Sequence, residues 1–384
     1  MEQTEHKKKQ LTVWEAACII TGYGIGGGVL AMPYLAAQNG VFVAALLLIA
    51  AFLASYLLHM MIADLAIKCG AGTQIVSVFS RFLFRGKAKM PLTISFFVLM
   101  AVVLCANLAA YIAGSADVLT GLLPISGLVA KLIFFVLAAS VVLFGLKAVG
   151  VSEKIMVTAI FAIIAALAVF SFTAQPHAMP VKVGTVKTAL AYFGMAMFAF
   201  SAFFSIPQAV EGLDGDERKV KKAVFLGLGN NLILIVVITF CALLASSEVT
   251  AVATTGWSAG IGDWAKIAGG VFTVLAMLTT YWSISLALSG IVHEQLKWSE
   301  KLCWLIAALP SLVLALLNFS GFLDFLEMAG GAIAIIVAVM VVPAYRNARR
   351  EVSGSILGRW GGTGFQIAII VAYLLMAAGS VMGL

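Results

Sequence analysis

The sequence predicts an all-α integral membrane protein with eleven transmembrane helices, and two observations support this fold class. Sixty-two per cent of the 384 residues are apolar and 11% are charged, whereas a water-soluble domain carries about 25% charged residues. Apolar runs also recur along the whole chain, each close to the roughly 20 residues that a helix needs to cross the hydrocarbon core. Because lipid offers no partners to backbone polar groups, each run is expected to be helical.

Eleven spans account for these runs. The longest polar stretches lie between them, at 69–91, 174–186 and 247–263, and are expected to be loops outside the membrane. The predicted spans are 12–38, 41–67, 92–119, 127–148, 152–173, 187–211, 222–246, 264–292, 301–317, 321–344 and 364–384.

Positive charge orients the spans, because short cytoplasmic loops accumulate Lys and Arg. With the N-terminus in the cytoplasm of the cell, 20 of the 24 Lys and Arg fall on that side of the membrane. The exceptions are Lys131, Lys182, Lys187 and Lys266. An odd number of spans then places the C-terminus outside the inner or plasma membrane. The net charge of +7 is explained by this sorting, so no nucleic-acid partner is expected.

The first span begins with a capping pattern and continues with a cluster of glycines. Thr12 and Glu15 have the spacing of a capping box, which satisfies the first free N–H groups of a helix. Five glycines follow between Gly22 and Gly28, and Pro33 comes after them. Glycine is a poor helix former, so the cluster predicts an unwound stretch near the middle of the membrane.

The sixth span shows a weaker form of the same pattern, with Gly194, Ser201, Ser205, Pro207 and Gly212. Interrupted helices at matching positions of two halves indicate a transporter site. The halves are helices 1–5 (12–173) and helices 6–10 (187–345). Each half crosses the membrane an odd number of times, so the second is predicted to be an inverted repeat of the first. Residues 1–11 form a cytoplasmic N-terminus, and 364–384 form an extra helix.

Three segments resemble a known family. GYGIGGGVLAMPYLAAQNG is similar to the first-helix signature of the amino acid/auxin permease family, and FAFSAFFSIPQAVEGLDGDERKVKKAVFLG to its sixth helix and following basic loop. NLAAYIAGSADVL resembles its third helix, with Tyr111 and Asp117 in the matching places. The resemblance covers about 12–230 well and the remainder loosely, and bacterial aromatic and hydroxy amino acid permeases are the most similar members.

The resemblance implies secondary active transport of an amino acid rather than an enzymatic activity. It also implies the LeuT-type fold of the amino acid–polyamine–organocation superfamily, a 5+5 inverted repeat, here with one extra helix. Related permeases often carry a histidine where this chain has Phe203, so a proton-carrying role of that histidine is not transferred.

The glycine segment is the predicted substrate site. Freed N–H groups around Gly26 to Gly28 can bind a carboxylate with help from the helix dipole, and freed carbonyls at 21–24 can bind an ammonium group or Na⁺. Close helix packing by small residues is the alternative. The candidate substrate-binding residues are Gly22, Tyr23, Gly24, Gly26, Gly27, Gly28, Asn107, Tyr111, Phe198, Phe200, Ser201, Phe203 and Tyr281.

A neutral L-amino acid is the expected substrate. The candidate residues are aromatic, amide, hydroxyl or glycine and offer no charge to pair with a substrate side chain. Burying an unmatched charge among them would be costly.

A sodium site is predicted beside the glycine segment, and no cofactor other than Na⁺ is expected. Thr279, Thr280 and Ser283 of the eighth span supply the oxygen ligands that hard cations prefer, completed by Thr21 and Gly24 of the first span. The alternative is that the threonines bond to their own helix backbone.

Ion coupling has two candidates. After Lys154 the fifth span has no lysine or acid at depth that could replace sodium, and this favours sodium over protons. Proton coupling through Asp64, His59 or Glu327 is the alternative. A sensor of the same fold, which binds an amino acid without transporting it, is a further alternative, although the chain has no long cytoplasmic tail.

Overall fold

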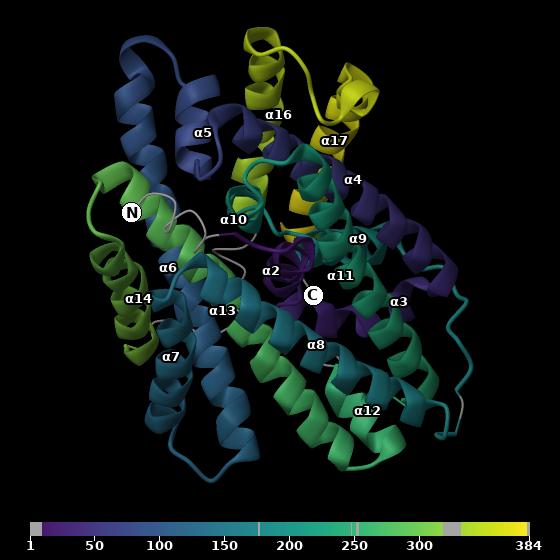
Figure 1. Ribbon diagram of the computed structural model, residues 1–384. Coiled ribbons are helices and arrows are strands. Elements are labelled where there is room, and N and C mark those ends of the chain that lie inside the picture. Colours follow the sequence, from purple (N-terminus) through teal and green to yellow (C-terminus); the bar gives the residue numbers. More distant parts are fainter. Residues whose placement is uncertain (1–9, 176, 247, 251–252, 318–331, 382–384) are drawn as a thin grey trace.

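The computed structural model describes residues 10–381 except 176, 247, 251–252 and 318–331. Within these residues the regular structure is entirely helical. The helices, labelled in Figure 1, are α2 (Val13–Gly24), η1 (Gly27–Ala31), α3 (Met32–Asn39), α4 (Val41–Cys69), α5 (Ile75–Phe82), η2 (Gly86–Ala88), α6 (Lys89–Leu122), α7 (Gly127–Leu143), α8 (Leu146–Ser171), α9 (Val186–Ala199), α10 (Ser205–Gly212), α11 (Glu217–Ala245), α12 (Ala253–Ile261), α13 (Trp264–Leu296), α14 (Glu300–Leu316), α16 (Ala332–Glu351), η4 (Gly358–Gly361) and α17 (Thr363–Val381).

The long apolar helices identify a multi-pass membrane protein. Six unbroken helical stretches in the described part of the chain are long and apolar enough to cross a membrane, namely α4, η2 with α6, α8, α11, α13 and α17. The bent pair of α2 and 28–39 is a seventh candidate, and α7 and α9 are shorter apolar helices. The all-helical membrane class is therefore confirmed, while the total of eleven spans stays a prediction. The tenth predicted span, 321–344, lies partly outside the described residues.

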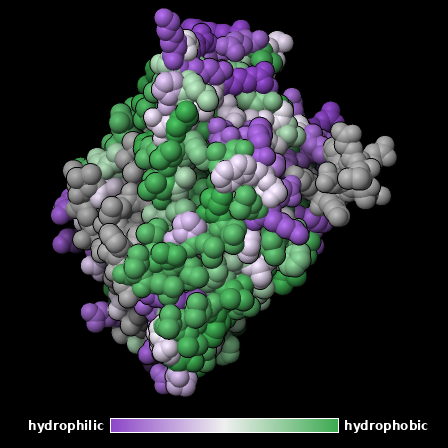
Figure 2. All heavy atoms as spheres, turned by 90° about the vertical axis from the view of Figure 1, so that its left-hand side faces the viewer, coloured by the Kyte–Doolittle hydropathy of each residue, from purple (hydrophilic) through white to green (hydrophobic). Residues whose placement is uncertain are grey.

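Large apolar side chains cover the outside of the helical bundle. Phe42 and Phe144 are 74% and 75% exposed, and Figure 2 shows hydrophobic residues across the middle of one face, with hydrophilic residues gathered toward the top. Apolar patches of this extent are rare on water-soluble monomers. They are favourable against lipid chains, which are as apolar as the side chains themselves.

Helix α2 lies in the interior of the bundle, where it packs against α8, α11 and α13 (Figure 1). Its residues 16–21 are completely buried. Small residues let the neighbours approach closely: a Cβ on Gly227 of α11 would lie 2.6 Å from the Cβ of Ile20. Because lipid provides no hydrophobic driving force between helices, such close contact is the main source of packing energy.

Two segments expected to be loops contain short helices. Helix α5 lies within 69–91, and α12 lies within 247–263. In α5 the apolar residues recur at helical spacing and are buried on one face, whereas Arg81 on the other face is exposed. An eight-residue amphipathic helix is too short and too polar to register as an apolar run, which is why the hydropathy pattern did not predict it.

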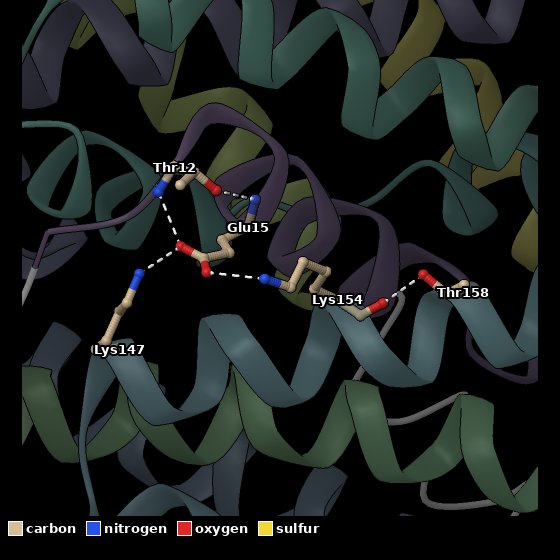
Figure 3. A network of polar contacts seen from close by, with 5 residues as sticks. All are labelled: Thr12, Glu15, Lys147, Lys154 and Thr158. Atoms are coloured by element: carbon tan, nitrogen blue, oxygen red, sulfur yellow. Dashed lines mark hydrogen bonds and ion pairs between the residues drawn. The ribbon is translucent and has the colours of Figure 1, made fainter.

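The predicted capping box at the start of α2 is confirmed (Figure 3). The Thr12 hydroxyl accepts from the Glu15 N–H at 3.2 Å, and the Glu15 carboxylate accepts from the Thr12 N–H at 2.8 Å. The same carboxylate pairs with Lys147 at 2.6 Å and Lys154 at 3.2 Å, both on α8. Glu15 therefore both caps α2 and fastens its first turn to α8.

Candidate substrate and ion sites

The first span is interrupted at the glycine cluster. Helix α2 ends at Gly24, where the Ile25 N–H still donates to the Thr21 carbonyl at 3.0 Å. A short 3₁₀ turn, η1, starts at Gly27, and the helical segment that follows is bent by 58° relative to α2. The change of direction takes the N–H groups around Gly26 out of the regular helix pattern, where a ligand can reach them.

The sixth span is interrupted between Ala199, the end of α9, and Ser205, the start of α10. His59 of α4 holds this break. Its Nε2 accepts from the Ala202 N–H at 2.9 Å, and its Nδ1 lies 2.6 Å from the Ser55 carbonyl, to which it donates. The ring also stacks on Phe203, with 5.0 Å between ring centroids. The contacts therefore fix a neutral imidazole that replaces a missing helical hydrogen bond.

A cavity of about 40 Å³ lies between the two breaks. Cavities that bind small molecules usually have a volume of at least about 300 Å³, so the helices must separate before a ligand can enter. The lining residues are Tyr23, Gly24, Gly26, Gly28, Asn107, Tyr111, Phe198, Ala199, Ser201, Phe203 and Ile284.

Nine of these lining residues belong to the set predicted from the sequence. Tyr111, on α6, lies against the first break, since a Cβ on Gly26 would lie 3.0 Å from its hydroxyl oxygen and 3.6 Å from Thr280 Oγ1. Gly27 lies in η1 between two of the lining glycines. The structure thus brings the first, third and sixth spans together around the glycine segment. The larger side chains that line the cavity are mainly aromatic, with one amide, Asn107.

Three of the predicted substrate residues lie elsewhere. Phe200 packs edge-on against Phe52 of α4, at 5.7 Å between ring centroids. Tyr281 meets Phe134 of α7, and its hydroxyl lies 3.4 Å from Ser311 of α14. Neither side chain lines the cavity. The carbonyl of Gly22 belongs to the oxygen cluster described next.

Oxygen atoms of α2 and α13 meet one turn before the first break. The Gly22 carbonyl accepts from Thr279 at 3.2 Å and from Thr280 at 2.9 Å, and the Ile19 carbonyl accepts from Ser283 at 3.3 Å. The two threonines also donate to the Ala276 carbonyl of their own helix. The predicted hydroxyl groups of the eighth span therefore do face first-span carbonyls.

The first-span members of the predicted sodium site face α11 instead. The Thr21 hydroxyl donates to the Ala17 and Gly227 carbonyls and accepts from Asn230 at 3.1 Å. At Gly24 a Cβ would overlap the amide of Asn231. Ile19 and Gly22 take the expected places beside α13, because residues three and four apart share a helix face and Thr21 and Gly24 lie on another one.

Glu153 of α8 joins this cluster, and the sequence analysis missed it. The side chain is completely buried, and its Oε1 lies 2.9 Å from the Ser283 hydroxyl. A Cβ on Gly22 would overlap its Oε2. Glu153 stands immediately before Lys154, at the edge of the predicted fifth span (152–173), and was not among the candidate residues. Its place in the buried stripe of α8 was the available signal, because Val149, Glu153 and Val157 are four residues apart.

Comparisons with known proteins identify the family of this chain. The model of the tryptophan/tyrosine permease family matches residues 9–379. The chain belongs to this family. A tyrosine-specific transport system 1 from Haemophilus influenzae is 25% identical, and the alignment covers 94% of each protein. The family consists of transport proteins, so this permease is a transporter of amino acids and not an enzyme.

Two solved structures share the fold of this permease. One is Mhp1, a nucleobase–cation–symport-1 family transporter in a closed conformation with bromovinylhydantoin bound; it is 14% identical, with a TM-score of 0.67 over 98% of this chain and 91% of that one. The other is MhsT in complex with L-phenylalanine, 15% identical, with a TM-score of 0.63 over 97% and 99% of the two chains. Both likenesses support the LeuT-like fold expected from the sequence.

Two of the residues named as alternative proton carriers, Asp64 and His59, make structural contacts in the described part of the permease. Asp64 pairs with Lys68 at 3.1 Å and accepts from the Ile356 N–H at 3.0 Å, so it ties the end of α4 to the segment before η4. His59 uses both ring nitrogens to hold the second break. Glu327 lies outside the described residues.

Proposed function

We propose that this permease is a symporter of aromatic amino acids that couples substrate movement to sodium. The single observation that carries the proposal is the cavity between the two helix breaks, which lies directly beside the oxygen cluster of α2, α8 and α13. Substrate and ion would thus share the α2 backbone, so binding of one would favour binding of the other.

Each part of an amino acid finds a matching group around the cavity. The carboxylate would accept from N–H groups at 26–28 and from the Tyr111 hydroxyl, near the positive end of the second half-helix. The ammonium group would meet carbonyls at the end of α2. The side chain would lie against Phe198 and Phe203, which favours an aromatic ring by edge and face contacts. The family name, tryptophan/tyrosine permease, and the tyrosine-specific transport system among the relatives support this class.

Transport would proceed by alternating access around the two breaks. The closed cavity of about 40 Å³ represents the occluded geometry, and the half-helices would tilt to open one side at a time. We place eleven spans in the cell membrane as a 5+5 inverted repeat plus one helix, with the N-terminus in the cytoplasm and the C-terminus outside. In this orientation the ion pairs of Glu15 with Lys147 and Lys154, here called the Glu15 clamp, hold the cytoplasmic end of α2 against α8.

Uptake by proteoliposomes tests the proposal. Purified protein is reconstituted with an inward sodium gradient, and uptake of labelled tyrosine, tryptophan and phenylalanine is compared with uptake in potassium. Sodium is expected to stimulate uptake of one or more of these substrates, while lysine and glutamate are excluded. Equal uptake in sodium and potassium would overturn sodium coupling, and the absence of any aromatic uptake would overturn the substrate class.

A further inference from the structure

An apolar groove runs between α4, α9 and α17 on the outside of the helical bundle. These three helices pack on one another (Figure 1), and the groove has a volume of about 1030 Å³. Pockets for small molecules usually measure about 300 to 1,000 Å³, so this groove is large enough for long hydrocarbon chains. It is lined by Leu47, Ala50, Leu53, Ala54, Tyr56, Leu57, Met60, Val186, Ala189, Leu190, Phe193, Lys221, Ile356, Leu357, Trp360, Phe365, Ala368, Ile369, Val371, Ala372 and Leu375.

The walls of the groove are fixed by close packing, while its interior stays open. Helices α9 and α17 meet through small residues, since a Cβ on Gly194 would lie 3.2 Å from the Met376 carbonyl oxygen. Leu53 of α4 and Val371 of α17 nevertheless remain 53% and 48% exposed. Because lipid chains are as apolar as these side chains, lipid is the expected neighbour of this surface in a membrane.

The length of the groove matches an acyl chain that enters from one leaflet. Leu47 and Met60 both line it from α4 and are thirteen residues apart. At about 1.5 Å per residue the groove follows α4 for roughly 20 Å. One leaflet contributes about half of the roughly 30 Å hydrocarbon core, so a chain anchored at one end can lie in the groove along its whole depth.

One end of the groove is basic. Lys221, near the start of α11, is the one charged side chain among the described lining residues, and it makes no ion pair in the described part of the chain. Arg218, three residues earlier, shares this helix face and is exposed. Trp360 of η4 also lines the groove and is 53% exposed, as suits an indole at the boundary between membrane and water.

Tyr56 adds a hydrogen-bond donor beside Lys221. Its ring packs edge-on against Phe225, with 6.1 Å between ring centroids, and Phe225 lies one turn after Lys221 on α11. The Tyr56 hydroxyl has no hydrogen-bond partner among the described residues. A phenol can donate one hydrogen bond, so Lys221 and Tyr56 together can bind a phosphate or ester oxygen.

We propose that this groove binds one anionic phospholipid of the cytoplasmic leaflet, with its phosphate on Lys221 and Tyr56 and its acyl chains along α4, α9 and α17. The orientation proposed above places Lys221 on the cytoplasmic side, where anionic lipids are found and basic pockets between helices bind their headgroups. No acidic side chain lines the described groove, so the amine of a zwitterionic headgroup finds no partner there. The lipid would also support α9, the first half of the broken sixth span.

Melting temperatures of the delipidated full-length protein in detergent test the headgroup preference. Phosphatidylglycerol should raise the melting temperature at lower concentrations than phosphatidylcholine with the same acyl chains, and glycerol phosphate without chains should not raise it. Lys221→Gln should weaken the effect of phosphatidylglycerol by about fivefold, the factor for one basic residue at the membrane surface. Lys222→Gln, which removes the exposed neighbouring charge, should match the unmodified protein. An equal response to both lipids, or an unchanged response of Lys221→Gln, would overturn the inference.

Filling the groove tests the position of the lipid. Ala368→Trp puts an indole into the groove from α17 and should abolish stabilisation by phosphatidylglycerol. Ala45→Trp, at an exposed position of α4 outside the groove, should preserve it. If Ala368→Trp instead converts a dimer into a monomer and leaves the lipid response unchanged, the groove binds a second copy of the chain and the inference is wrong.

Native mass spectrometry of the unmodified protein needs no variant that folds. After incubation with equal amounts of the two lipids, one phosphatidylglycerol per chain should be retained under conditions that remove phosphatidylcholine. Retention of neither lipid, or of both equally, would contradict the proposed site, and neither result would bear on amino acid transport or sodium coupling.

Discussion

Gly26 lies in the first break and faces the Tyr111 side chain of α6. A Cβ on Gly26 would lie 3.0 Å from the Tyr111 hydroxyl oxygen and 3.6 Å from Thr280 Oγ1. A larger side chain would therefore fill the small cavity and push the phenol away from the freed N–H groups. It would also favour a continuous helix over the break.

We expect Gly26→Leu to abolish tyrosine binding while leaving the protein folded in the membrane. Gly229→Leu on α11 is the matched control, because a Cβ there meets no atom within 4 Å. Equilibrium binding and size-exclusion profiles of both variants provide the measurement. Near-normal binding by Gly26→Leu would support the alternative in which the glycines serve helix packing alone.

Thr279 and Thr280 both donate to the Gly22 carbonyl, but their other neighbours differ. Thr279 packs beside Gly22 at the Glu153 end of the oxygen cluster, whereas Thr280 reaches toward Gly26 and Tyr111. We expect Thr279→Ala to raise the sodium concentration for half-maximal uptake by about ten- to hundredfold, the range for losing one charge-assisted contact of roughly 1.5–3 kcal/mol. Thr273→Ala, whose hydroxyl bonds to the Gly269 carbonyl of its own helix, is the control. An unchanged sodium requirement would remove Thr279 from the ion site.

The sequence predicted most of the residues that line the cavity, but not which way every helix turns its side chains. Gly and Pro in the middle of apolar runs predicted both breaks, because glycine is a poor helix former and proline removes a helical hydrogen bond. The structure places Tyr281, Phe200 and Thr21 away from their predicted positions at the site. The rotation of each helix about its axis is set by packing, which a single sequence does not reveal. Glu153 was not predicted either, although its spacing from Val149 and Val157 places it on the buried face of α8.

At the scale of elements, Glu15 joins α2 to α8 at one end of the bundle (Figure 3). Its side chain is 4% exposed, whereas Lys147 and Lys154 are each 40% exposed. Removing the carboxylate charge leaves the lysines free to enter water, so the loss falls mainly on the α2–α8 contact. Leu11 also packs against Gly150 and Gly212 beside the Glu15 ion pairs. Because this contact remains when the charge is removed, we expect the first turn of α2 to loosen but not to unfold.

We expect Glu15→Gln to open this end of the bundle and to speed modification of Cys18, which is completely buried one turn further along α2. The rate of maleimide labelling is measured in a background where Cys69, Cys105, Cys241 and Cys303 are replaced by alanine. Glu217→Gln controls for charge removal. Labelling of Cys18 that is equally slow in both variants would show that the clamp does not govern opening.

At the scale of the whole molecule, lipid makes the sequence unusually informative. A span must be largely apolar and mostly helical, so the positions of the apolar runs predicted the fold class and most helix positions. Exposed phenylalanines on the outer surface follow from the same constraint. The short helices α5 and α12 were not predicted because they lie outside the apolar runs.

The proposed topology predicts opposite locations for the two ends of the chain. It rests on the sorting of 20 of 24 Lys and Arg to one side. A reporter fused after Lys9 should be active in the cytoplasm, and the same reporter fused after Leu384 should not. Activity of both fusions on one side of the membrane would rule out an odd number of spans.

A thermal-shift screen of the purified protein tests the central claim most directly, because a ligand that binds the folded state stabilises it by about 2.7 kcal/mol at one hundred times its dissociation constant. We expect tyrosine, tryptophan or phenylalanine to raise the melting temperature, more in sodium than in potassium. Lysine and glutamate should give no shift, and no aromatic amino acid should shift the Gly26→Leu variant. Stabilisation by none of the aromatic amino acids in either salt, or equal stabilisation of Gly26→Leu, would contradict this claim.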